Sequence, residues 1–121
     1  MWLGEDHIFG SPRGWMGTTW DRAPAQEAGL RDGFAQVAAW GQATGRPLFP
    51  AEFGTSNNAD MASRARWTRF NRQLAEHHGI PWGIWSFGPI FAIYDPGTRT
   101  FHPGLLAALM DWCYVPPCAA N

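Results

Sequence analysis

The sequence predicts an α/β fold, and three observations on the 121-residue chain lead to this class. Apolar residues make up 45% of the chain, which is enough hydrophobic mass for one domain core or for part of one. Short apolar segments rich in aromatic and β-branched residues are typical of buried strands. These segments alternate with segments of helical periodicity, and this alternation indicates βαβ units with parallel strands.

The first third of the chain predicts a short strand, a loop and a helix. A strand is expected near Asp6–Phe9, and a long loop rich in Gly, Pro, Trp and Thr follows it. A helix is expected over Glu27–Thr44, because apolar residues recur on one face and Gly45 then ends the pattern. The apolar face of this helix comprises Leu30, Phe34, Val37 and Ala38.

The middle of the chain predicts a second strand and the clearest helix. "PLFPAEF" reads as a short buried strand over Leu48–Glu52, although Pro50 inside it indicates an edge position or a bulge. "TSNNADMASRARWTRFNRQLAEHHG" reads as a helix with Asn57 or Asn58 as N-cap and Asp60 in the first turn. Its buried face is expected to hold Trp67, Phe70 and Leu74, with Gly79 as the C′ residue.

The last third predicts a strand, a turn and a short helix. "IPWGIWSFG" contains the strand Trp82–Phe87, "YDPGTRTFHP" is a turn, and "GLLAALMDW" is helical. At most three parallel strands result. Such a small sheet buries its two faces poorly and leaves two unpaired edges, so part of the sheet is expected to be missing.

The composition excludes some classes of partner. A net charge of -1 predicts no broad attraction to nucleic acid or to acidic lipid. No apolar run approaches the roughly 20 residues that span a bilayer, and "MWLGEDHIFG" lacks the features of a signal peptide. Cys113 and Cys118 are compatible with a disulfide or with two free thiols, but their spacing is not that of a zinc site.

The eight tryptophans are too many to be core residues alone in so short a chain. Flat indole faces suit the C–H faces of pyranose rings, so at least one tryptophan is a candidate for sugar binding. Trp15 and Trp20 are candidates for lining outer sugar subsites or for covering one end of the fold.

Four motifs in this order form a specific pattern: "RPLFPAEFG", "ADMASRARWTRF", "HGIPWGIWSFG" and "FAIYDPGTRTFHPGLLAAL". Together they resemble the C-terminal part of a family 5 glycoside hydrolase, in particular the bacterial endoglucanases or cellulases, over residues 46–109. The resemblance implies that residues 1–121 are a C-terminal fragment of a (β/α)8 (TIM) barrel, with its site at the C-terminal ends of the strands. Asp6–Phe9, Leu48–Glu52 and Trp82–Phe87 would then belong to strands six, seven and eight, an open-edged half unless another chain completes it.

The same resemblance assigns roles to three residues. Glu52 matches the catalytic nucleophile, Trp85 matches the sugar-stacking tryptophan of strand eight, and His7 matches a histidine that lines the cleft. Each has a plainer interpretation: Glu52 as a helix cap or ion-pair partner, Trp85 as a core indole, His7 as a solvated or capping residue.

Departures from the family pattern put activity in doubt. Phe9 stands in place of a tyrosine, Ala51 in place of a glycine, and Ser86 where an acidic residue is common. Retaining glycosidases use two carboxylates about 5–5.5 Å apart, a nucleophile and an acid/base. The family takes the acid/base from an Asn-Glu-Pro motif, which does not occur here. Weak or absent activity is therefore expected of the chain alone.

The resemblance implies retaining hydrolysis of β-1,4-glucans, an extracellular location, and neither a metal nor an organic cofactor. The expected partners are a β-glucan oligo- or polysaccharide, and a second copy or an N-terminal half-barrel that completes the fold. The alternative is a non-catalytic carbohydrate-binding or assembly half-barrel, and a truncated chain that folds poorly is a third interpretation.

Overall fold

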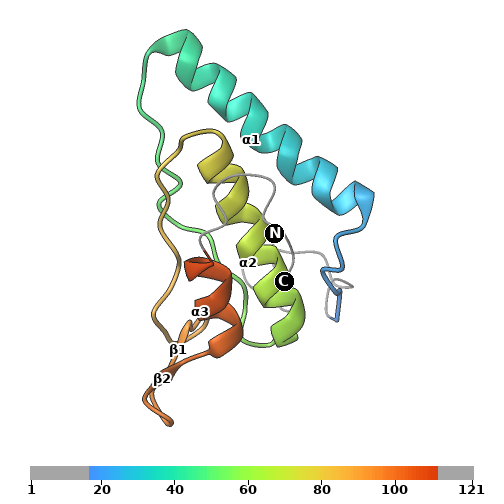
Figure 1. Cartoon of the computed structure of the whole chain (residues 1–121), viewed down its shortest axis with the longest axis vertical. Helices are drawn as coiled ribbons and strands as arrows, with labels where there is room; N and C mark the ends of the chain where they lie inside the picture. Colours follow the sequence, from blue (N-terminus) through green and yellow to red (C-terminus); the bar gives the residue numbers. More distant parts are fainter. Residues whose placement is uncertain (1–16, 112–121) are drawn as a thin grey trace.

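The computed structural model describes residues 17–111, and every structural statement below concerns these residues. They form three helices and one hairpin: α1 (Pro24–Thr44), α2 (Met61–His77), β1 (Tyr94–Asp95), β2 (Thr100–Phe101) and α3 (Pro103–Met110). Figure 1 shows α2 in the centre, with α1 on one side of it and α3 on the other. The strand predicted at Asp6–Phe9 lies outside the described residues.

Helix α1 confirms the prediction of a helix ending at Thr44, but it begins three residues earlier than predicted. Pro24 occupies its first turn, where a missing N–H costs nothing. The Gln26 side chain caps the start, because its Oε1 accepts from Ala23 N at 3.1 Å. Gly45 follows the last turn with a φ of 63°, a left-handed conformation that glycine adopts without strain.

Helix α2 confirms the strongest helix prediction and corrects its N-cap. Asp60 is the N-cap, and its Oδ1 accepts a hydrogen bond from Ser63 N at 2.8 Å. The prediction of Asn57 or Asn58 was wrong because Asn57 instead bonds the distant loop around Pro89 and Ala92. Gly79, with a φ of 66°, follows the C-cap residue as predicted.

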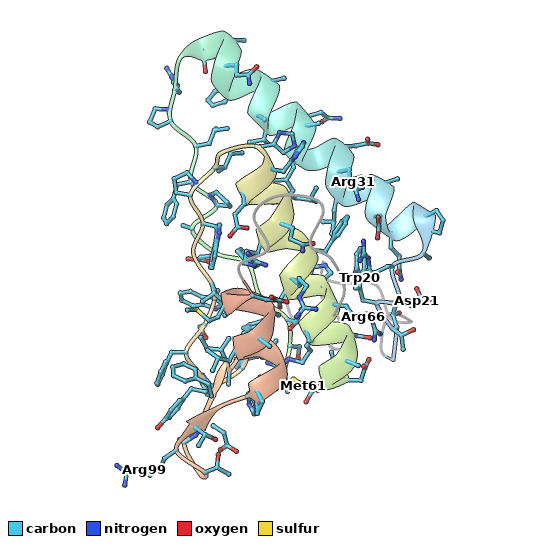
Figure 2. The ribbon with its side chains drawn as sticks, in the orientation of Figure 1. Trp20, Asp21, Arg31, Met61, Arg66 and Arg99 are labelled. Atoms are coloured by element: carbon cyan, nitrogen blue, oxygen red, sulfur yellow. The ribbon has the colours of Figure 1, made fainter. Side chains whose placement is uncertain are left out.

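The hydrophobic core lies on α2. Trp67, Phe70 and Leu74 are buried, which confirms the predicted face. Trp20 packs with them, 6.0 Å from Phe70 between ring centroids, and is fully buried between α1 and α2 (Figure 2). Trp20 is therefore a core residue and does not line a subsite; Trp15 lies outside the described residues.

The two predicted strands Leu48–Glu52 and Trp82–Phe87 were wrong in extent. They are reduced to one parallel bridge between Phe53 and Ile84, with Phe53 N donating to Gly83 O at 3.3 Å. Gly83 N donates to Pro50 O, one residue away from the regular partner Ala51. The irregularity that Pro50 indicated is therefore present, and these segments remain extended chains that lie side by side (Figure 1).

The turn and the short C-terminal helix are confirmed, although α3 begins one residue before "GLLAALMDW" and ends at Met110, and Trp112 lies outside the described residues. The expected turn is a hairpin in which Tyr94 pairs with Phe101 and Asp95 with Thr100, and α3 follows it. Arg99 lies at the hairpin tip, away from the helices (Figure 2). None of the helices in residues 17–111 is long and apolar enough to cross a membrane.

Candidate functional site

The parallel bridge brings two of the predicted site residues onto neighbouring segments. Trp85 N donates to Phe53 O at 2.8 Å, directly after Glu52. Side chains alternate between the two faces of extended chains, and residues paired across the bridge share a face. Glu52 and Trp85 each lie one position from the bridged residues Phe53 and Ile84, so both belong to the opposite face.

Phe53 shows which face this is. Its ring centroid lies 6.2 Å from that of Trp67 on α2 and 5.8 Å from that of Trp82. Trp82 also faces α2, because its Nε1 donates to Glu76 Oε1 at 3.3 Å. Glu52 and Trp85 are therefore directed away from the helices, toward the side that is the interior of a (β/α)8 barrel.

Both side chains are accessible. Glu52 is exposed and forms no ion pair or hydrogen bond with any residue between positions 17 and 111. Trp85 is 49% exposed, whereas the core indoles of Trp20 and Trp67 are 0% and 3% exposed. The arrangement leaves a carboxylate and an indole on one open face. His7, the third predicted site residue, lies outside the described residues.

Gly54 is a site residue that sequence analysis missed. A Cβ atom at this position would lie 1.6 Å from the carbonyl oxygen of Trp85, so no side chain fits without a backbone shift. The glycine thus allows the chain after Glu52 to approach the chain at Trp85. The only signal in the sequence is the glycine itself, placed directly after the strand-like segment "PLFPAEF".

Asn57 and Arg64 are two further residues that were missed. Asn57 accepts from Ala92 N at 2.8 Å, and Arg64 Nη2 donates to Ala92 O at 2.7 Å, so both hold the loop that follows Trp85. Burial lowers the pKa of the Arg64 guanidinium from its ordinary value. The polar run "TSNN" hinted at a loop but not at its partner.

A cavity of about 630 Å³ lies between this loop and the start of α2. Its walls include aromatic and polar side chains, among them Asn57, Arg64, Phe87, Tyr94, Asp95 and His102. Phe87 and Tyr94 are stacked with ring centroids 4.6 Å apart. Hydrogen bonds from the amides of Gly97 and Thr98 lower the pKa of Asp95, so its carboxylate is ionised at neutral pH.

No protein-family profile and no curated protein matches the sequence, but solved structures do. Thermotoga maritima Cel5A, described in complex with mannotriose, is 30% identical with a TM-score of 0.80, over 89% of this chain and 34% of that one. A protein described as an endoglucanase is 31% identical with a TM-score of 0.75, over 82% of this chain and 31% of that one. Clostridioides difficile cellulose synthase subunit Z is 27% identical with a TM-score of 0.76, over 88% and 36%.

The chain thus spans about a third of the length of these proteins. Its α-rich architecture with an open edge is that of part of a (β/α)8-barrel glycoside hydrolase. The resemblance predicted from the sequence motifs is confirmed at the level of the family: the solved structures that this chain resembles are family 5 glycoside hydrolases of the endoglucanase type.

Proposed function

We propose that this chain supplies the nucleophile side of a retaining β-1,4-glucanase site. Glu52 attacks the anomeric carbon and displaces the leaving sugar oxygen, and water then releases the covalent glycosyl enzyme. One observation carries the proposal: Glu52 and Trp85 lie on the same face of two hydrogen-bonded parallel segments, exposed and directed away from the helices.

The environment of each residue supports its proposed role. The Glu52 carboxylate has no cationic partner among residues 17–111, so no ion pair competes for its oxygens. The half-exposed indole of Trp85 offers an apolar surface to a pyranose ring. His7 is proposed to line the same cleft. The substrate class follows from relatives described as bound to cellobiose and mannotriose, both short oligosaccharides.

We propose that the acid/base carboxylate comes from a second polypeptide or from an N-terminal half-barrel. Retaining hydrolysis needs this group about 5–5.5 Å from the nucleophile to protonate the leaving oxygen. Its absence lowers the rate by roughly 10²–10⁴-fold, so the chain alone is expected to turn over cellopentaose weakly or not at all. The proposed chemistry uses no metal or organic cofactor.

The test separates the nucleophile from the missing acid. 2,4-Dinitrophenyl 2-deoxy-2-fluoro-β-cellobioside carries a leaving group that departs without protonation, so the trapping step needs only the nucleophile. Intact-protein mass spectrometry should show one glycosyl adduct, and peptide mapping should place it on Glu52. The Glu52→Gln variant should form none. Asp32→Asn, which changes an exposed carboxylate on α1 far from the site in sequence, is the matched control and should react like the wild type.

Two results would contradict the proposal: an adduct on Glu52→Gln, or no adduct on a folded wild-type chain that binds cellopentaose. The second result would favour a non-catalytic carbohydrate-binding or assembly half-barrel. Exposed apolar side chains favour assembly in particular, since Val37, Trp40 and Phe49 are 50%, 50% and 63% exposed. Light scattering on the same sample would show whether a second copy covers them. An extracellular location stays a prediction.

A further inference from the structure

We infer that Asn57 and Arg64 form a clamp that holds Trp85 in position relative to Glu52. The inference rests on the proposed function for its consequence, sugar binding, but the clamp itself is defined by hydrogen bonds. It joins the loop that follows Glu52 to the loop that follows Trp85, and neither residue needs to touch substrate. Both are therefore positioning residues.

Asn57 makes three bonds to one loop. Its backbone N–H donates to Ile90 O at 2.9 Å, its Nδ2 donates to Pro89 O at 2.6 Å, and its Oδ1 accepts from Ala92 N at 2.8 Å. A side-chain amide carries both a donor and an acceptor, so this residue type can serve both sides of the loop at once. Neither aspartate nor leucine could reproduce the pattern.

Arg64 closes the clamp from α2. Its Nε donates to Thr55 Oγ1 at 3.2 Å, and its Nη2 donates to Asn57 Oδ1 at 3.2 Å and to Ala92 O at 2.7 Å. The side chain is 3% exposed, and no carboxylate between residues 17 and 111 pairs with it. A buried guanidinium is costly unless its donors are used. Here its hydrogen bonds reach neutral acceptors on both loops.

The clamped loop is connected to Trp85 by its own hydrogen bonds. Ser86 N donates to Phe91 O, and Ile93 N donates to Ser86 O, both at 3.1 Å. These bonds close residues 86–93 into a loop. Asn57 holds the loop at Pro89 and Ile90, and Asn57 and Arg64 together hold it at Ala92. Trp85 therefore stands between two fixed points, the bond to Phe53 on one side and the clamped loop on the other. Loss of the clamp would free the loop after Trp85 but would leave the bond between Trp85 N and Phe53 O intact.

The first readout is amide exchange of Ala92, because its N–H donates to Asn57 Oδ1. Asn57→Ala and Arg64→Met should each speed this exchange by about tenfold or more, the effect of losing one or more hydrogen bonds. Exchange in the centre of α2 should not change. Arg64→Lys keeps the charge but not the planar fork, and it should be intermediate. Gln73→Ala and Arg99→Met, exposed changes of the same residue classes, should leave Ala92 exchange at the wild-type rate.

The second readout is cellopentaose affinity in a double-mutant cycle with Trp85→Ala. Asn57→Ala should weaken binding in the wild-type background and add nothing in the Trp85→Ala background, because both changes act through the same indole. A purely structural role would instead weaken binding equally in both backgrounds and would speed α2 exchange as well.

Unchanged Ala92 exchange in Asn57→Ala and Arg64→Lys would overturn the inference, as would an additional loss of affinity in the double variant. Failure of the proposed function looks different. In that case the wild type would bind no cellopentaose, or Trp85→Ala would bind like the wild type, while Ala92 exchange would still decide whether the clamp exists. If Asn57→Ala does not fold, Arg64→Lys provides the same comparison.

Discussion

Helices α1 and α2 differ sharply in how much of their surface the described chain covers. Helix α2, with 17 residues, buries nine of them, whereas α1, with 21 residues, buries only Ala38 and Gly41. Helix α2 is enclosed by Trp20 on one side, α3 on another and the Phe53 segment on a third. Most helical stability in proteins comes from packing of this kind, so α2 is the stable centre of the chain.

Helix α1 instead borders an apolar groove of about 420 Å³. The groove is lined by Leu30, Phe34, Val37, Leu48, Phe49 and Ile80, together with small residues. The difference in burial between α1 and α2 indicates which helix holds the candidate site in place. Phe53 contacts Trp67, so the segment that carries Glu52 is anchored to the well-packed helix α2 at its end, while its start at Leu48 lies close to Gly41 of α1.

The largest expected effect comes from the contact between the two site segments. Gly54→Ala should destabilise the fold by about 3 kcal/mol or more, because the new Cβ would lie 1.6 Å from the Trp85 carbonyl oxygen and the backbone must move. Urea unfolding measures the change in the free energy of unfolding. Gly33→Ala is the control on α1: nothing lies within 4 Å of its Cβ position, and it should stabilise by about 0.5–1 kcal/mol. Equal changes in the free energy of unfolding for Gly54→Ala and Gly33→Ala would show that the close approach at Gly54 does not matter for stability.

The junction of α2 and α3 is the next test. Arg72 is 2% exposed, and it donates to Ala108 O at 2.9 Å, to Asp111 O at 2.8 Å and to Glu76 Oε2 at 2.7 Å. Arg72→Met should cost about 2 kcal/mol, because it leaves a buried carbonyl without its donor and the Glu76 carboxylate without its cationic partner. Chemical denaturation followed by circular dichroism would measure this loss.

The control for this change lies three residues away on the same helix. Arg69 pairs with Asp111 at 3.2 Å, but the two side chains are 42% and 58% exposed. Arg69→Met should therefore change stability by less than about 0.5 kcal/mol. If Arg69→Met cost as much as Arg72→Met, burial would not be what distinguishes the two arginines.

The N-cap of α2 predicts a smaller effect with a pH signature. Asp60→Ala should cost about 1 kcal/mol at neutral pH. Hydrogen bonds from Ser63, by its side chain and its backbone amide, lower the pKa of Asp60 in the folded state. The stabilisation by the Asp60 carboxylate is therefore complete above its pKa in the unfolded state, which is about 4. It is lost as the pH falls through the lower pKa of the folded state.

Asn at position 60 still caps a helix but does not titrate. The stability difference between wild type and Asp60→Asn, measured by urea unfolding at about pH 6 and about pH 3, should thus shift in favour of the variant on acidification. A constant difference across this range would show that the Asp60 carboxylate does not change its proton affinity on folding.

What could be predicted from the sequence was local, and what could not was set by residues distant in the chain. The ends of α1 and α2 were predictable because Gly45 and Gly79 supply the positive φ that ends a helix. The extent of the two predicted parallel strands was not predictable, because a strand is extended by its neighbours. Among residues 17–111 the two segments are joined by the single bridge Phe53–Ile84. Sequence motifs named Glu52 and Trp85, but their common face follows only from this pairing.

The N-cap error has the same cause. Asn57 has the chemistry of a cap, yet its side chain bonds the loop at Pro89 and Ala92, more than thirty residues further along. Asp60 caps α2 in its place. Because a side chain with several possible partners is assigned by tertiary contacts, the same competition hid the clamp formed with Arg64.

The smallest expected effect tests the uncovered side of α1. Val37→Gln should change the unfolding free energy of the chain by less than about 0.5 kcal/mol, because the valine is 50% exposed. Leu74→Ala on α2, where the leucine is 4% exposed, should cost about 2–5 kcal/mol. If another polypeptide covers this groove, Val37→Gln should weaken its association with the chain, because the polar amide would be buried in the interface. The stability of the separate chain should stay the same. Sedimentation of the two variants over a range of concentrations distinguishes these cases: a shift toward smaller species in Val37→Gln alone would show that the face of α1 is an interface, and identical profiles would show that it is not.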